Sequence, residues 1–146
     1  MIFVTRELYN GIQIDSGWER RAERDWVRRS EIYSRYYEVI STLLPSKVQR
    51  LCKHGLHDAF VESVSLKGGT LFLLMDAKNA LGGFCGRKVG LTFSGIRKRI
   101  AVRGLRGQWW LYEEAHLSSK ARFSLHVMFD KSDVEIEADD LLIERM

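Results

Sequence analysis

The chain has 146 residues, of which 45% are hydrophobic and 11% aromatic, and these values predict one domain over residues 1–146 with a well-filled core. No apolar run approaches the roughly 20 residues that span a bilayer, the first residues show no signal-peptide pattern, and the two cysteines lack metal-type spacing. This composition argues against a membrane-spanning protein and a disulfide-rich secreted domain. We expect a cytoplasmic protein with reduced thiols, no cofactor and no membrane contact.

The net charge of +4 is unevenly distributed along the chain. Residues 59–111 carry nine Lys or Arg against two acidic residues, whereas residues 112–146 carry four against nine. A basic segment can bind nucleic acid through its phosphates, but it can equally face an acidic partner or the acidic C-terminal part of the same chain. The charge pattern leaves these alternatives open.

Residues 1–55 are predicted to be mainly helical. Ser16-Gly-Trp-Glu19 has the form of a capping box at the start of a long helix. Downstream, apolar residues recur at three-, four- and seven-residue steps, which places them on one stripe of that helix, and Pro45 ends it. Ser46 is expected to cap a short second helix over Lys47–Lys53, which closes at Gly55. The stripe consists of Trp18, Ala22, Trp26, Tyr33, Tyr37, Ile40 and Leu44.

Residues 56–146 are predicted to form an antiparallel β-sheet of about five to six strands, on which the two helices pack. Glycine-containing turns separate short runs of alternating polar and apolar residues, the pattern of half-buried strands. The basic segment 97–106 reads as an edge strand or a long loop. Helices followed by strands indicate an α+β fold.

The stretch Gln108–Ser118, QWWLYEEAHLS, separates into two faces if it forms a regular strand. One face, predicted to point into the core with Glu113 among it, consists of Trp109, Leu111, Ala115 and Leu117. The opposite face is predicted to be half-buried at most and to meet a partner. With His126 from the next strand, it consists of Trp110, Tyr112, Glu114 and His116.

The candidate chemical groups have structural explanations that we favour over catalytic ones. His57 and Asp58 are expected to bond the backbone where helix gives way to strand, because a His-Asp metal centre needs further ligands on helices. Adjacent glutamates on a strand point to opposite faces and cannot act as an acid/base pair, so an inward Glu113 needs a partner, which we expect to be an arginine of the basic segment. Glu114, with His116 and His126, is an alternative metal site, but we predict no metal and no catalytic residue.

Four motifs resemble those of a family of small bacterial proteins classed as a domain of unknown function. They are Phe3-x-Thr5-x-Glu7-Leu-Tyr9, Leu56-His-Asp-Ala59, Trp109-Trp-Leu-Tyr-Glu-Glu114 and Leu125-His-Val-Met-Phe-Asp130. This resemblance implies no established activity. The Leu-His-Asp sequence followed by a hairpin also resembles the start of several small bacterial immunity proteins, and this second resemblance implies neutralisation of a toxin domain.

We therefore predict a non-enzymatic protein-binding module, with an immunity protein that binds a bacterial toxin domain as its more specific form. Aromatic side chains rimmed by charge are typical of interface centres, which favours the face of Trp110, Tyr112, Glu114, His116 and His126. The alternative is a nucleic-acid-binding protein that uses the basic segment. Its cations are Arg97, Lys98, Arg99, Arg103 and Arg106.

Overall fold

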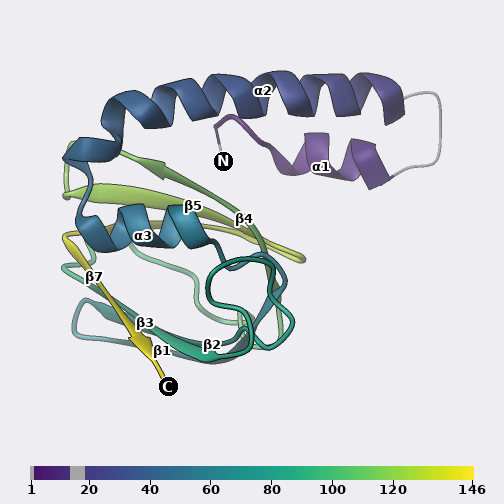
Figure 1. The fold of residues 1–146 in the computed structure, drawn as a ribbon. Coiled ribbons are helices and arrows are strands. Elements are labelled where there is room, and N and C mark those ends of the chain that lie inside the picture. Colours follow the sequence, from purple (N-terminus) through teal and green to yellow (C-terminus); the bar gives the residue numbers. More distant parts are fainter. Residues whose placement is uncertain (1, 14–18) are drawn as a thin grey trace.

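The computed structural model describes residues 2–13 and 19–146, which form an α+β fold (Figure 1). Within these residues, the helices all precede Gly55 and the strands all follow Asp58. The helical elements are α1 (Arg6–Gln13), α2 (Glu19–Ile40), the 3-10 helix η1 (Ser41–Leu43) and α3 (Ser46–His54). The strands are β1 (Ala59–Lys67), β2 (Thr70–Asp76), β3 (Lys88–Ser94), β4 (Trp109–His116), β5 (Phe123–Phe129), β6 (Asp133–Ala138) and β7 (Asp140–Arg145).

The predicted long helix is α2, and its apolar stripe faces the rest of the molecule. Along α2 from Arg20, Ile40 is buried and residues of the stripe such as Trp26 and Tyr33 are partly covered, while most of the remaining side chains are exposed. The helix ends at Ile40 rather than at Pro45, because the chain passes through η1 and Leu44 is extended (φ −81°, ψ 149°), as the residue before a proline prefers. Residues 16–18 of the predicted capping box lie outside the described residues.

The short second helix is α3, but its start differs from the prediction. Pro45, not Ser46, occupies the N-cap position, and no side chain caps this end. Its C-terminal end matches the prediction, because Gly55 adopts φ 64° and donates its N–H to the carbonyl of Leu51. Helix α1 was not predicted, although the sequence carries a signal for it. The Thr5 hydroxyl accepts the N–H of Leu8, and Glu7 lies in the first turn.

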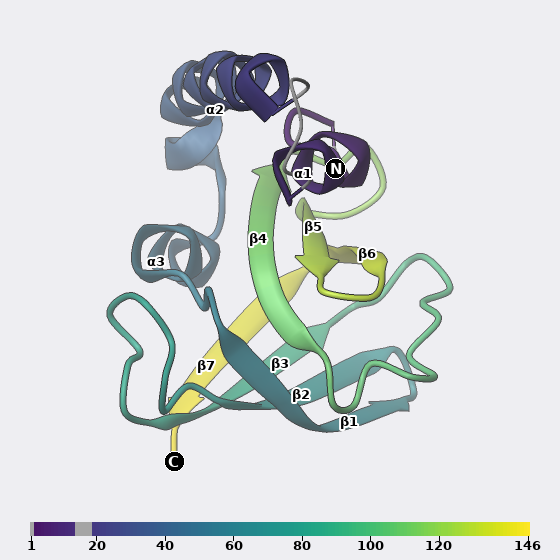
Figure 2. The ribbon, with the colours of Figure 1, turned by 90° about the vertical axis from the view of Figure 1, so that its right-hand side faces the viewer.

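In the described part of the chain the sheet has seven antiparallel strands in the order β6-β5-β4-β1-β2-β3-β7, so the prediction of five to six strands was too low. The strand missed is β7, which follows β6 after one residue, Asp139. Strands β6 and β7 form the two opposite edges of the sheet, although they are almost adjacent in the sequence. The sheet must therefore curl so that its two edges come together. Figure 2 shows this curvature, with β4 and β5 running across the directions of β1, β2, β3 and β7.

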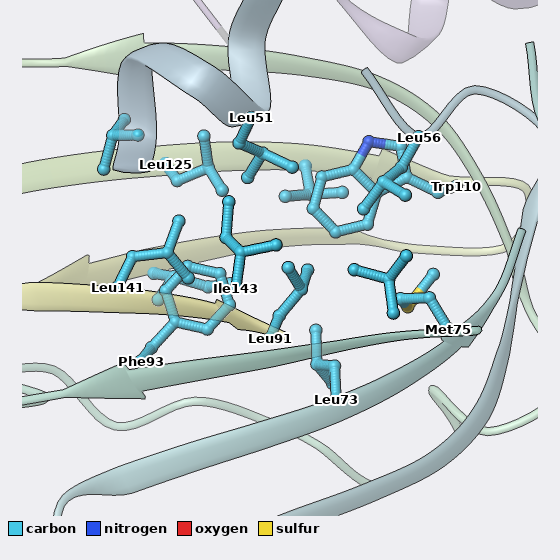
Figure 3. Close-up of a cluster of buried hydrophobic side chains, with 14 of the residues drawn as sticks. Leu51, Leu56, Leu73, Met75, Leu91, Phe93, Trp110, Leu125, Leu141 and Ile143 are labelled. Atoms are coloured by element: carbon cyan, nitrogen blue, oxygen red, sulfur yellow. The ribbon is translucent and has the colours of Figure 1, made fainter. Parts of the chain in front are cut away.

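The main hydrophobic core fills the inside of this curl (Figure 3). Trp110 on β4, Leu125 on β5, and Leu91 and Phe93 on β3 come from three different strands, and each is fully buried. Helix α3 contacts β4 and β7 and adds the fully buried Leu51. Helix α3 thus covers the opening between two strands that are not paired with each other.

Two β-bulges lie close to the short junction of β1 with β4. The register shifts between Val61 and Ser63 in β1, and between Trp110 and Tyr112 in β4. Each bulge reverses the alternation of side chains along its strand, because one extra residue opposes the partner strand. The inward-facing residues of β4 therefore differ from those that a regular strand would present.

Helices α1 and α2 lie side by side at one end of the molecule, beyond β4 and β5 and away from β1–β3 (Figures 1 and 2). Their contact is close, since a Cβ on Gly11 would come within 3.1 Å of the Ala22 Cβ. They cover the side of β4 and β5 that faces away from the main core. The described helices include none that combines the length and the apolar character needed to cross a membrane.

Candidate functional site

Trp110 is fully buried, so the predicted partner-binding face is wrong at this position. Its neighbour Trp109, predicted to be core, is 40% exposed, and Leu117, also predicted to be core, is 42% exposed. The bulge at Leu111 is the physical reason for the exchange of the two tryptophans, whereas Leu117 lies beyond the end of β4 at His116. The bulge puts Trp110 on the same side as Glu113 and Ala115, whose cross-strand partners on β5 are fully buried.

The other predicted face residues do share one side of β4 and β5, but the chain covers them itself. Glu114 is 1% exposed and His116 is 6% exposed, so the expectation of a half-exposed face is wrong for both. Tyr112 is partly covered, and its ring lies 4.7 Å from that of Trp26 and 6.1 Å from that of Tyr9. Sequence periodicity grouped these residues correctly but could not show that α1 and α2 cover them.

Glu114 fixes the N-terminal segment onto β4. Its carboxylate accepts hydrogen bonds from the backbone N–H groups of Ile2 (2.9 Å), Phe3 (3.1 Å) and Val4 (2.6 Å), and it contacts the His116 ring at 3.2 Å. Burial raises the pKa of Glu114, but the hydrogen bonds from His116 and from these N–H groups outweigh burial and hold the pKa below its ordinary value. The side chain acts as a carboxylate that anchors backbone.

The histidines lie beside this anchor. The rings of His116 and His126 are 4.8 Å apart, and His116 also stacks on Phe3 and meets the Tyr36 hydroxyl at 3.3 Å. Burial lowers the pKa of His126, and the nearby His116 adds to this effect. The lowered pKa favours the neutral form of His126, which limits charge repulsion between the two rings.

These same residues are where a metal ion would find ligands, since the ligand atoms of Glu114, His116 and His126 lie within 4.8 Å of one another. Both oxygens of Glu114, however, already accept backbone N–H groups of residues 2–4. A metal would have to displace the N-terminal segment. The arrangement therefore fits an anchor for α1 and α2 better than a metal centre.

His57 and Asp58 lie between α3 and β1 and contact β4. The His57 ring nitrogen Nδ1 lies 2.5 Å from the carbonyl oxygen of Leu111, and the N–H of Asp58 donates to the carbonyl of Trp110 at 2.8 Å. Asp58 adopts a positive φ of 65°, which is uncommon for a residue other than glycine. Both residues bond the backbone next to the bulge, and their two side chains are 3.8 Å apart.

Glu113 points inward, and its hydrogen-bond partner is not the predicted arginine. The indole Nε1 of Trp110 donates to Glu113 Oε2 at 2.7 Å, a contact between residues three apart that the bulge permits. Burial raises the pKa of Glu113 to about 7, while the bond from Trp110 and the charge of His57 lower it. Glu113 also lines a cavity of about 300 Å³ where α2, α3 and β4 meet.

The basic segment 97–106 forms a loop between β3 and β4, visible in Figure 2, and not an edge strand. Two of its cations pair with the acidic C-terminal part of the chain: Arg97 with Asp139 between β6 and β7 at 2.5 Å, and Lys98 with Glu135 on β6 at 2.5 Å. The bond from Lys98 holds the pKa of Glu135 below its ordinary value. The remaining cations, all exposed, are Arg99, Arg103 and Arg106.

Trp109 lines a second cavity, at the protein surface, which was not predicted from the sequence. Its ring packs edge-on against that of Phe60 at 5.2 Å, and the two rings line a cavity of about 270 Å³ together with Asp76, Lys78 and Asn79. The backbone N–H of Trp109 donates to the Asp130 carboxylate at 2.8 Å. The two adjacent tryptophans were the sequence signal for this exposed ring, because successive residues of a strand point to opposite faces and cannot both be buried on one face.

Comparison with known families identifies the family of this chain. Residues 6–138 match the family described as "Protein of unknown function (DUF4085)". The chain belongs to this family, which confirms the resemblance to a domain of unknown function. Comparison with curated proteins finds no match to the chain.

Proposed function

We propose that this DUF4085 protein is a non-enzymatic protein-binding module whose contact surface is centred on Trp109. One observation carries the proposal: the Trp109 ring is 40% exposed beside Phe60, while the adjacent Trp110 is fully buried. Tryptophan is enriched among the side chains that dominate binding energy, and such anchors sit within a polar rim. Here Asp76 and Lys78 provide that rim around the hollow.

The residues first expected to meet a partner act inside the molecule in this arrangement. Trp110 supports the core, and Glu114 and His116 hold the N-terminal segment. In our proposal, Tyr112 and His126 support the same packing, and the partner contacts the Trp109 surface instead. A partner side chain that enters the hollow would contact both aromatic rings.

The more specific form of the proposal is an immunity protein that neutralises a bacterial toxin domain in the cytoplasm. The resemblance of the segment at Leu56 to immunity proteins supports this form. Cys52 and Cys85 are free, which supports a reducing compartment. A toxin gene directly upstream of the gene for this protein would supply the partner to test.

The decisive experiment is reconstitution of the complex with the purified upstream toxin domain. Trp109→Ala should weaken binding at least about tenfold, a loss of roughly 1.4 kcal/mol, without changing the thermal transition substantially. The matched control is Leu117→Ala, which removes an equally exposed apolar side chain at the other end of β4. Full binding by Trp109→Ala would assign the contact to another surface, and no protection of cells from the toxin would remove the immunity role.

Nucleic-acid binding is the second candidate, and the exposed arginines of the 97–106 loop favour it. Arg99, Arg103 and Arg106 are exposed, whereas Arg97 and Lys98 pair with acidic residues of the same chain. Binding through phosphates should weaken steeply as salt rises from about 50 to 200 mM. Absence of binding to DNA and RNA at the lower salt concentration would eliminate this candidate.

A further inference from the structure

The cavity at the meeting point of α2, α3 and β4 has an acidic lining. It is formed by Tyr33, Ser34, Tyr37, Glu38, Cys52 and Glu113, with a volume of about 300 Å³. Ser34 and Glu38 are exposed, whereas the other four side chains are partly covered, so the cavity opens to solvent along α2. Two carboxyl groups therefore line the cavity without a basic side chain, in a protein whose net charge is +4.

Glu113 lacks a counter-ion in this cavity. Its Oε2 accepts the indole N–H of Trp110, and within the described residues no donor is bonded to its Oε1. His57 is the base whose charge acts on Glu113, but this ring bonds the Leu111 carbonyl. Burial without a full set of partners explains why the pKa of Glu113 is raised to about 7.

The thiol and the two phenol groups of the cavity are uncharged at neutral pH. Burial raises the pKa of the Cys52 thiol to about 12 and that of Tyr37 to about 12, and it also raises the pKa of Tyr33. The rings of Tyr33 and Tyr37 lie 6.0 Å apart. An aromatic face attracts a cation, and the attraction increases where water is excluded. Glu113 and Glu38 therefore supply the charge of the cavity, and the tyrosines supply its apolar walls.

We propose that this cavity binds the cationic head group of an organic amine or guanidine, with Glu113 as its counter-ion and Tyr33 and Tyr37 as its walls. A volume of about 300 Å³ is at the small end of ligand pockets, enough for the head group and a short carbon chain. The head group can belong to a free amine or to a Lys or Arg side chain of a protein. This proposal does not depend on the Trp109 surface.

The proposal predicts a specific pH dependence. Glu113 must be ionised to serve as a counter-ion, so binding should strengthen as pH rises through about 7. The groups that face or act on Glu113 are Tyr33, Tyr37 and Glu38 from α2, Cys52 from α3, His57 before β1 and Trp110 on β4. Cys52 and Tyr37 stay protonated between pH 5 and 8, so they do not reverse this trend.

The test is an NMR titration of the whole protein at pH 8 with n-butylammonium, N-methylguanidinium and the neutral 1-butanol. Both cations should give saturable shifts at Cys52, at Glu113 and at the indole N–H of Trp110, and 1-butanol should bind at least tenfold more weakly. Glu113→Gln keeps an oxygen for the Trp110 bond but removes the charge, and it should reduce cation affinity at least tenfold. Lowering the pH to 5 should weaken binding to the wild-type protein.

Two control variants separate this site from general charge effects. Glu31→Gln removes an exposed carboxylate from α2 outside this cavity and should leave binding unchanged. Trp109→Ala should also leave it unchanged, so failure of this proposal is distinguishable from failure of the protein-binding proposal. Equal binding of 1-butanol, undiminished binding by Glu113→Gln, or no saturable shift with either cation would overturn the site.

The source of the head group is tested with lysine capped at both ends as an N-acetyl methylamide. If capped lysine binds as tightly as n-butylammonium, the cavity accepts a side chain presented by a protein backbone. If capped lysine is excluded while n-butylammonium binds, the ligand is a free amine. Both results retain Glu113 as the counter-ion.

Discussion

Glu113 and Glu114 are neighbours on β4 that face opposite sides of the strand, and their pKa values move in opposite directions. Glu113 faces inward with one hydrogen-bond donor, Trp110, and burial raises its pKa to about 7. Glu114 faces the N-terminal segment, where backbone N–H groups and His116 outweigh burial and lower its pKa. Glu114 is the more deeply covered of the two, yet its pKa is the one that is lowered, so the number of donors, and not burial alone, determines which form is favoured.

The same contrast distinguishes the two sides of β4. The inward side joins an apolar core in which Trp110, Leu125 and Phe93 are fully buried. On the other side, directional bonds hold the chain in place, since Arg6 donates to the carbonyls of Phe129, Asp130 and Ser132 and pairs with Asp133 at 2.8 Å. Loss of one bond can loosen α1 without unfolding the core.

The largest effect on stability is expected from removing the side chain of Trp110, which donates to Glu113. Trp110→Ala should lower the free energy of unfolding by about 3–5 kcal/mol, because it deletes a fully buried indole and the only donor to Glu113 seen in the described residues. Trp109→Ala is the matched control and should cost less than about 1 kcal/mol, since its ring is exposed. Urea denaturation measures both, and equal losses would contradict the different placement of the two tryptophans.

Glu113→Gln should stabilise the protein at high pH. The Glu113 pKa is about 7 in the folded protein against an ordinary value of 4.5, so its favourable contribution is complete below pH 4.5 and is lost as pH rises through 7. The variant should therefore exceed the wild type by up to about 3 kcal/mol at pH 8 and lose that advantage at pH 4. Unfolding free energies of both proteins between pH 4 and 8 test this prediction. A difference between them that does not change with pH would contradict it.

Glu114→Gln should destabilise the N-terminal segment by about 1–3 kcal/mol. Both carboxylate oxygens now accept backbone N–H groups, and in the variant one of these oxygens is replaced by an NH₂ group, which cannot accept a hydrogen bond. Hydrogen exchange should accelerate at Ile2–Val4 and in α1, with β2 and β3 unchanged. In the wild type, the lowered pKa of Glu114 means that its contribution is lost as pH falls below about 4.5. Uniform acceleration throughout the sheet would show that the two sides are not independent.

The smallest effect is expected at Thr5, whose hydroxyl accepts the N–H of Leu8 at the start of α1. Thr5→Ala should cost about 1 kcal/mol. Exchange of the first amides of α1 should rise, with no change in the core. Thr5→Ser, which keeps the hydroxyl, should behave like the wild type.

Local patterns were sufficient to predict the types of most elements. The seven- and four-residue steps between Trp26, Tyr33 and Tyr37 predicted α2, and alternation predicted β5 and β6. Helix α1 was missed because it has only eight residues, fewer than the roughly 11 to 18 over which a helical repeat of apolar residues is recognised. Strand β7 was missed because only one residue separates it from β6.

The candidate sites were less accessible to sequence reasoning. A bulge depends on how two strands pair, so nothing within β4 alone shows that Leu111 interrupts the alternation. The cavity at Glu113 collects side chains from α2, α3 and β4, and no local spacing relates Cys52 to Glu113. Sequence reasoning identified Glu113 as an inward carboxyl but expected an arginine partner where the structure has Trp110.

Sequence by itself determined the α+β class, the order of helices before strands, the family and the grouping of Tyr112, Glu114 and His116 on one side of β4. These features follow from side-chain periodicity, which is a local property of the backbone. Only the tertiary structure decided that α1 and α2 cover that side, that the two tryptophans exchange their predicted places, and that Glu113 lines a cavity. Those outcomes depend on long-range packing and on one extra residue in a strand, and both arise only when distant segments meet.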